Sequence, residues 1–537
     1  MAIAARSATL PRRTDIGDLI VLHLEGTYRE MGRQQVELLG LLARDTYDLH
    51  RSDWAGLLRT LGPLAAADRF LPRFWMTAGP RYDRSGTYDE ILGIGDALRV
   101  SPASAWRGVF GTLGGATTTF VATRSATADG AAIMAKNSDW PDRYGQRPPM
   151  VTHYNPTNGD MRHVTAGWPL SPLGAAGINE AGLAFGLNFF NADQVLALGL
   201  PRWPYRRVLQ KAATVPEAIR MITGSPNRGI SGFVSLAGAN GDIALVECVP
   251  GECEVVRPEG DWFAQSNHAR TEKMIKHDRG RSLDSFTRRP AMEAAVEAQV
   301  GQLTPGAASR ILRDRSNSSY LNESTVANLS AFHSVVVHPA SRTLWHSTAR
   351  QPQAPFGELV PFTPGAEDSP QAPLPADPRF GTPEMERENA VVGELRTAMR
   401  LFEEGSLQEA AAIWDRFAER GEPLVQPQRL SWAQARGRWV SGRLDEAEEI
   451  LAGLDGENTP FDVRANAMVA RASVLDRLGR RQDAVETYAR AQAYLEVNSE
   501  YNDGLISPLR KRIAEGLKRP QDGKPMPEFP GLQRIPG

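Results

Sequence analysis

Residues that can do nucleophilic and acid–base chemistry stand close together between positions 117 and 140. A run of hydroxyls that begins at Thr117 is followed, after Asp129-Gly130, by Lys136 and Asp139. The segment predicts a β-hairpin, because Asp-Gly suits a tight turn that needs positive φ. Its strand-like stretches are 117–123 and 131–136. Counting back from the turn places Asp139 beside Thr117, so a hydroxyl, an amine and a carboxylate meet; the alternative is a hairpin whose ends are merely charged.

The same stretch resembles the start of the mature chain in N-terminal-nucleophile amidohydrolases of the linear-amide branch. That branch includes dipeptidases and secernins, penicillin acyltransferase, acid ceramidase and bile salt hydrolase. Its pattern is a nucleophile, two small polar residues and an apolar one, then Asp-Gly, then Arg or Lys-Asn-x-Asp. The pattern fits Thr117–Trp140 without a gap. Further motifs follow in the family's order: the leading segment Gly26–Leu39, Gly177–Leu183, Gln265–Ala269, Asp284–Arg288 and the closing strands between Ser334 and His346.

The resemblance covers about residues 18–360 and implies an α+β fold, a four-layer αββα sandwich. It also implies that a linear C–N amide bond is broken or exchanged through an acyl-Thr117 ester. Most members have cysteine where this chain has Thr117, but an N-terminal threonine activated by its own amine is an established nucleophile. That amine requires cleavage between Ala116 and Thr117. The small residues Gly114-Gly115-Ala116 suit the strained attack on the carbonyl of residue 116, although Gly-Gly before a strand is also an ordinary turn.

The resemblance then gives roles to the charged positions. The α-amine of Thr117, with a reference pKa near 8, takes the hydroxyl proton. Asp139 accepts hydrogen bonds from that amine, and Lys136, in the family's Arg or Lys position, disfavours its protonation. A surface pair of Lys136 and Asp139 is the alternative.

Three more positions receive roles from the same resemblance. Asn179 and Asn267 donate amide hydrogens to the oxyanion of the tetrahedral intermediate, and Arg288 holds the site together or binds an acidic substrate group. The alternatives are ordinary turn asparagines and a solvated arginine, since Arg289 lies beside Arg288.

The elements that must position these residues change character along the chain. A strand is expected at Leu19–Leu24, a long helix from Gly26 towards His50, more helices up to about Arg99, and mainly strands from Gly111 to about residue 350. Prolines then crowd the chain. The predicted division has five parts. They are a leading segment (1–116), a catalytic core (117–360), a proline-rich linker (361–388), helical repeats (389–520) and a tail (521–537). After cleavage, the leading segment would remain bound as a small subunit.

The helical part repeats every 37 residues, as three sets of positions show: Gly405, Gly442 and Gly479; Ala398, Ala435 and Ala472; and Ala410, Ala447 and Ala484. Each unit predicts a helix, a turn with glycine and a second helix. The units resemble tetratricopeptide repeats, whose usual period is about 34 residues. Such hairpins could bind a peptide, pair two subunits or cover the first domain.

Composition excludes several other classes. A chain of 537 residues needs more than one core, and a net charge of −2 argues against nucleic-acid binding. Two cysteines, Cys248 and Cys253, are too few for a disulfide scaffold or a four-cysteine metal site. They are expected on two strands joined by a Pro-Gly turn, in a structural or idle role. No signal-peptide core or stretch of about 18 apolar residues is present, so a cytoplasmic protein is expected.

Two functions therefore remain. The first is an autoproteolytically activated amidohydrolase or acyltransferase that acts on a small-molecule amide or short peptide and needs no metal or organic cofactor. The second is a catalytically inactive scaffold whose repeats bind a protein partner or associate with themselves. Phosphate-binding loops, dinucleotide fingerprints and Gly-x-Ser-x-Gly elbows are absent from the sequence. The sequence does not decide between hydrolysis and acyl transfer. It also does not identify the acyl group or the amine of the substrate.

Overall fold

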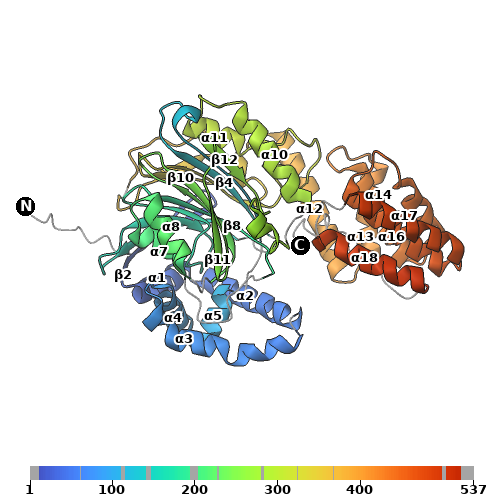
Figure 1. The fold of residues 1–537 in the computed structure, drawn as a ribbon, viewed down its shortest axis with the longest axis horizontal. Coiled ribbons are helices and arrows are strands. Elements are labelled where there is room, and N and C mark those ends of the chain that lie inside the picture. The colour runs from blue at the N-terminus through green and yellow to red at the C-terminus, as the bar shows by residue number, and fades with distance from the viewer. Residues whose placement is uncertain are drawn as a thin grey trace, which may run out of the picture.

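The computed structural model describes residues 11–60, 62–110, 115–140, 147–193, 203–225, 229–279, 283–322, 324–366, 368–498 and 503–521. In these ranges two β-sheets face each other with helices on their outer sides, and a separate group of helices follows at the C-terminal end (Figure 1). The predicted α+β fold, a layered sandwich followed by an all-helical region, is confirmed.

The larger sheet has nine strands in the described residues, and all its pairings are antiparallel except β2 with β5. Its order is β1 (Arg12–Ile16), β2 (Leu19–Gly26), β5 (Met150–Pro156), β6 (His163–Gly167), β7 (Ala176–Asn179), β8 (Ala184–Phe189), β9 (Gly232–Ala237), β10 (Ile243–Val249) and β11 (Glu252–Val256). The smaller sheet has six strands: β12 (Trp262–Gln265), β3 (Ala116–Ala122), β4 (Ile133–Asp139), β13 (Ala331–His338), β14 (Thr343–Ser347) and β15 (Leu359–Phe362).

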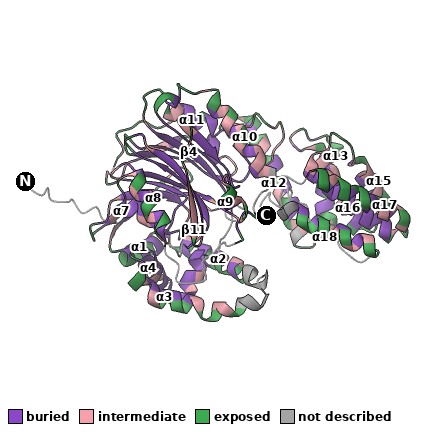
Figure 2. Ribbon diagram, in the orientation of Figure 1, coloured by how far each residue is buried: buried purple, intermediate pink, exposed green. Residues whose placement is uncertain are grey.

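Apolar side chains fill three layers around these sheets. Between the sheets lie residues such as Met134, Ile178 and Val335. Helices α7 (Pro204–Lys211) and α8 (Val215–Thr223) cover the larger sheet, and α10 (Leu283–Glu297) and α11 (Pro305–Ile311) cover the smaller one. The short helix α9 (Glu272–Ile275) follows β12. The strands are accordingly buried along most of their length, while the helices expose one side (Figure 2).

The leading segment packs a further layer of helices against β2 and β5. These are α1 (Tyr28–Leu39), α2 (Leu41–Thr60), the 3₁₀ turn Gly62–Arg69, α3 (Leu71–Tyr82), α4 (Thr87–Leu98) and α5 (Pro102–Phe110). Thr27 and Glu30 form a capping box that starts α1. The long helix expected from Gly26 is interrupted, because Gly40 adopts φ 58° between α1 and α2.

The hairpin predicted from Asp129-Gly130 is present, and Gly130 has φ 76°. Strand β3 pairs with β4 so that Ala116 lies opposite Asp139 and Thr117 lies opposite Ser138. The short 3₁₀ turn Arg124–Ala126 lengthens the connection beyond a two-residue turn. The register nevertheless brings Asp139 back to the start of β3, as the sequence predicted.

The helical region is made of α12 (Pro383–Glu403), α13 (Leu407–Glu419), α14 (Pro427–Val440), α15 (Leu444–Gly453), α16 (Phe461–Arg477), α17 (Arg481–Val497) and α18 (Asp503–Lys518). The three repeated glycines lie between the helices of three successive hairpins with φ of 84°, 75° and 75°, so the predicted turns are present. Helix α12 begins inside the stretch predicted as linker, because Thr382 caps it and Pro383 is accepted in its first turn.

The two cysteines lie on β10 and β11, directly opposite each other, and form a disulfide. The predicted strand pair is therefore present, and the thiols form a structural cross-link across one hairpin. A cytoplasmic location stays a prediction. Among the described residues, no helix combines the length and apolar character that crossing a bilayer requires.

Candidate active site

Thr117 lies at the start of β3 with 4% of its surface exposed. Its backbone N–H donates to Asn267 Oδ1 at 2.7 Å. The register places Asp139 beside the peptide bond that joins Ala116 to Thr117. The predicted cleavage position is therefore enclosed by polar groups, while Gly114, predicted just before it, lies outside the described residues.

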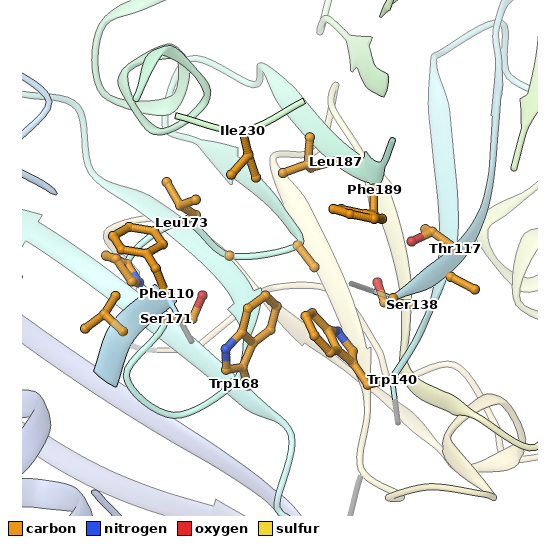
Figure 3. Close-up of a pocket in the computed structure, with 16 residues that line it drawn as sticks. Phe110, Thr117, Ser138, Trp140, Trp168, Ser171, Leu173, Leu187, Phe189 and Ile230 are labelled. Carbon is orange, nitrogen blue, oxygen red and sulfur yellow. The ribbon is translucent and has the colours of Figure 1, made fainter. Parts of the chain in front are cut away.

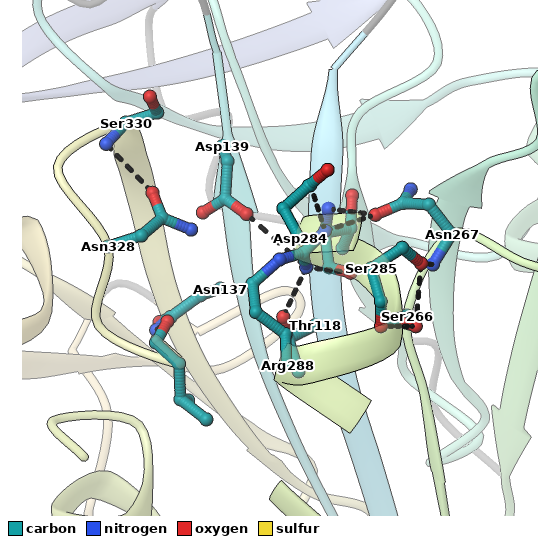
Figure 4. A network of polar contacts seen from close by, with 12 residues as sticks. Thr118, Asn137, Asp139, Ser266, Asn267, Asp284, Ser285, Arg288, Asn328 and Ser330 are labelled. Carbon is teal, nitrogen blue, oxygen red and sulfur yellow. Dashed lines mark hydrogen bonds and ion pairs between the residues drawn. The ribbon is translucent and has the colours of Figure 1, made fainter. Parts of the chain in front are cut away.

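Arg288 organises this enclosure from α10 (Figure 4). Its guanidinium donates to Thr117 O at 2.8 Å, to Thr118 Oγ1 at 2.5 Å and to Asn267 Oδ1 at 3.0 Å. It also donates to Asp284 Oδ2 at 3.1 Å, one helical turn earlier. A planar fork with several donors suits such a cluster better than a point charge would. Arg288 is fully buried, so the solvated alternative is wrong for this residue.

Asp139 is also fully buried, with Oδ2 3.7 Å from Arg288 Nη1. Burial raises the pKa of its carboxyl, while Arg288, the Asn328 amide and Lys136 oppose that rise. The cationic and amide neighbours thus only partly offset the rise in pKa that burial and the nearby Asp284 cause, and the carboxyl lies next to the place where a free amine of Thr117 would appear.

Lys136 reaches across to the larger sheet, where its Nζ donates to Leu187 O at 2.9 Å and to Asn188 Oδ1 at 3.3 Å. Burial lowers its pKa to about 7, against the attraction of Asp139. A surface Lys136–Asp139 pair is therefore wrong, since both side chains are buried.

The structure separates the two asparagines to which the resemblance gave one role. Asn267 holds Thr117 N and Arg288 through Oδ1, and its Nδ2 donates to Phe189 O at 2.9 Å. Asn179 lies at the far end of β7, where Nδ2 donates to Leu209 O and Ala212 O at 3.1 and 2.8 Å. Its Oδ1 accepts from the backbone of the following turn. Asn179 is thus a buried turn residue and is not brought to Thr117, because its amide already satisfies local backbone groups.

Sequence reasoning missed Asn188 on β8. Its Oδ1 accepts from Thr119 Oγ1 at 2.8 Å as well as from Lys136, and its Nδ2 donates to Gln265 O and Ser266 O. Asn188 therefore links β8 of the larger sheet to strands β3 and β12 of the smaller one. The available signal was a polar amide inside an apolar strand run, Ala184–Phe189.

A pocket opens in front of Thr117 and encloses about 730 Å³, part of it open to solvent. Its walls are mainly aromatic and aliphatic, and they come from both sheets, from α5 and from the loop after β6 (Figure 3). The large lining residues are Phe110, Trp140, Trp168, Leu173, Leu187, Phe189 and Ile230. Gly115 and Ala116 line the same pocket as Thr117, so the bond predicted to be cut lies in its wall.

A buried ion pair supports one wall of this pocket. Arg206 on α7 donates to the carbonyl of Pro172, a lining residue, and pairs with Glu90 on α4 at 2.5 Å. The guanidinium lies between the rings of Tyr28 and Tyr154, 4.9 and 4.7 Å from their centres. The leading segment therefore supports the pocket wall at Pro172 through the Glu90–Arg206 pair, and it contributes Phe110 to the lining.

Within the described ranges, His, Cys, Asp and Glu do not gather in a group of three or more that could hold a metal ion. The groups around Thr117 are a hydroxyl, a backbone amide, a carboxylate, a guanidinium and an amide. Together they can hold an amine, move a proton and attack a carbonyl, which is acyl-transfer chemistry.

Residues 125–353 match the family model described as acyl-coenzyme A:6-aminopenicillanic acid acyl-transferase, and the match begins just after Thr117. None of the curated proteins compared with the chain matches it.

The chain is also similar to solved structures. An N-acylethanolamine-hydrolyzing acid amidase ortholog from Caenorhabditis elegans is 14% identical with a TM-score of 0.32, over 42% of this chain and 93% of that one. Two mutant forms of conjugated bile acid hydrolase from Clostridium perfringens are each 12% identical, with TM-scores of 0.31 and 0.32. They cover 43% and 47% of this chain and 88% and 99% of their own. Over residues 125–353 the chain is therefore similar to this acyl-transferase family, which agrees with the N-terminal-nucleophile resemblance that the motifs carry.

Proposed function

We propose that this protein is an autoproteolytically activated amidohydrolase or acyltransferase with Thr117 as its nucleophile. The observation that carries the proposal is the position of the Ala116–Thr117 bond, which lies in the wall of an apolar pocket between Asp139 and Asn267. The family match supports an enzyme that acts on amides; cleavage and the nucleophile are our additions.

Maturation would begin when the Thr117 hydroxyl attacks the carbonyl carbon of Ala116. The bond from that carbon to Thr117 N breaks as the ester forms, the hydroxyl proton passes to the freed nitrogen, and water then hydrolyses the ester. The new α-amine would stay between Asn267 Oδ1, which already accepts from this nitrogen at 2.7 Å, and the Asp139 carboxylate. In the mature enzyme the amine would take the hydroxyl proton as Thr117 attacks the substrate carbonyl, and would return it to the leaving nitrogen.

The pocket walls favour an apolar acyl group. Burying an aliphatic or aromatic chain against Trp140, Trp168 and Phe189 removes apolar surface from water, which is favourable by about 25 cal/mol per Å². We therefore propose N-acyl amino acids and short-chain acyl amides as substrates, with water or a second amine as the acceptor.

The test is the size and N-terminus of the purified chain. We expect two fragments on a denaturing gel, the larger beginning at Thr117, and we expect Thr117→Ala to remain one chain without amidase activity. Thr123→Ala is the matched control: this buried threonine lies just beyond the other end of β3 and bonds Gly241 O, so cleavage should persist. An uncut wild type that hydrolyses no acyl amide would instead favour the scaffold function.

A further inference from the structure

Ser138 has a buried hydroxyl with no hydrogen-bond partner in the structure. The residue is 3% exposed and lines the pocket. It stands directly opposite Thr117 in the β3–β4 ladder, and side chains of directly opposed residues lie on the same face, with Cβ atoms about 5 Å apart. Figure 3 shows both hydroxyls directed towards the pocket.

A buried hydroxyl without a partner has lost its hydrogen bonds to water and gained none in return, so a group that fills the pocket and bonds this hydroxyl would be favoured. The other polar side chains among the described lining residues are Thr117, Ser171, Trp140 and Trp168. Indole groups only donate hydrogen bonds, and Thr117 is used as the nucleophile. Ser171 lies on the far side of Trp168 from Thr117 (Figure 3). Among these side chains, Ser138 is thus the acceptor beside the reacting bond.

We infer that Ser138 Oγ accepts a hydrogen bond from the N–H of the scissile amide and so selects amides over the corresponding esters. This inference rests on the proposed function and assigns one contact within it. As the Thr117 Oγ–acyl bond forms and the C–N bond breaks, the hydroxyl proton travels through the α-amine to the leaving nitrogen. Ser138 gains and loses no proton, and it holds the nitrogen in the orientation that this transfer needs.

The test compares an amide with an ester of the same acyl group, hexanoyl p-nitroanilide and p-nitrophenyl hexanoate, using processed enzyme. In Ser138→Ala, kcat/KM for the amide should fall about three- to ten-fold, the loss expected for one neutral hydrogen bond. The value for the ester, which has no N–H to donate, should stay within about two-fold. Ser138→Thr keeps a hydroxyl and should retain most of the amide-to-ester ratio. Ser171→Ala, a pocket hydroxyl remote from Thr117, should change both substrates by the same factor.

The outcomes separate this inference from the proposed function. A wild type that cleaves neither substrate would contradict the proposed function. A wild type that cleaves the amide, with an amide-to-ester ratio unchanged in Ser138→Ala, would overturn only the role of Ser138. Equal losses on both substrates would also overturn it, because they would place Ser138 against the nucleophile or its amine. A Ser138→Ala chain that stays uncut would do the same, since it would assign the hydroxyl to maturation.

Discussion

Arg288 connects groups that are far apart in the sequence, namely the carbonyl of Thr117, the amide of Asn267 and the carboxylate of Asp284. A lysine carries the same charge but lacks the planar fork, so it cannot serve all these acceptors at once. In Arg288→Lys we expect the free energy of unfolding to fall by about 3 kcal/mol, equivalent to two lost charged hydrogen bonds.

Urea denaturation checks this expectation, and Arg289→Lys is the control. Arg289 is the next residue on α10, has a quarter of its side chain exposed and lies 3.6 Å from Glu293. Its substitution should change the unfolding free energy by no more than about 0.5 kcal/mol. If the two variants were equally stable, the enclosure around Thr117 would not depend on the shape of the guanidinium.

The residues of this site differ in how far the sequence alone could place them. Thr117, Lys136 and Asp139 lie on one hairpin. Its turn can be recognised from Asp129-Gly130, and counting residues back from that turn predicts that the three residues lie close together. Asn188 comes from the other sheet, and only the stacking of the sheets brings it to Lys136. Asn179 shows the opposite case: its motif matches, but its amide is used by the backbone around it.

At the scale of elements, the Glu90–Arg206 pair joins α4 to α7 with both side chains almost fully buried. Breaking a buried pair leaves an uncompensated charge and commonly costs about 3–5 kcal/mol. Glu90→Ala should therefore lower the unfolding free energy by about that amount, and denaturant titration would measure it. Asp96→Ala is the control. Asp96 is an exposed residue on α4, the helix of Glu90, and it pairs with Arg29 and Arg33. Its substitution should change the free energy of unfolding by about 1 kcal/mol or less. Similar losses in both variants would contradict the prediction.

The sequence predicts the presence of helices and turns more accurately than it predicts where the helices begin and end. Glycines at a spacing of 37 residues predicted the turns of three hairpins, because each adopts positive φ. The proline-rich pattern predicts too late a start for α12, because it assigns Pro383 to the linker although proline is favourable in a first helical turn. The break at Gly40 was missed because a single glycine inside a helical pattern does not by itself reveal its φ.

For the whole molecule, the buried histidines predict a dependence of stability on acid. Burial lowers the pKa of four of them well below 6.5: to about 4 for His50 and His346 and to about 3 for His153 and His163. The unfolded chain binds protons near pH 6.5 and the folded chain does not, so the stabilisation present above pH 6.5 is lost as pH falls towards 4.

Each histidine contributes at most about 1.4 kcal/mol per pH unit, and the raised pKa values of buried carboxyls such as Glu90 act in the opposite sense. We expect the free energy of unfolding to fall by several kcal/mol between pH 6.5 and 5, as about four histidines of this kind would produce. Unfolding free energies at pH 8, 7, 6 and 5, with proton uptake measured by calorimetry, check it. A constant free energy from pH 7 to 5 would contradict the prediction.

The two residues that precede Thr117 share its pocket. If these two residues withdraw from the pocket once the bond before Thr117 is cut, the pocket is first occupied by the protein's own polypeptide and only later by substrate. A change that reshapes the walls for a different acyl chain would then also alter how readily each new molecule becomes an enzyme. Selection for new substrates would be restricted to shapes that still admit Gly115 and Ala116.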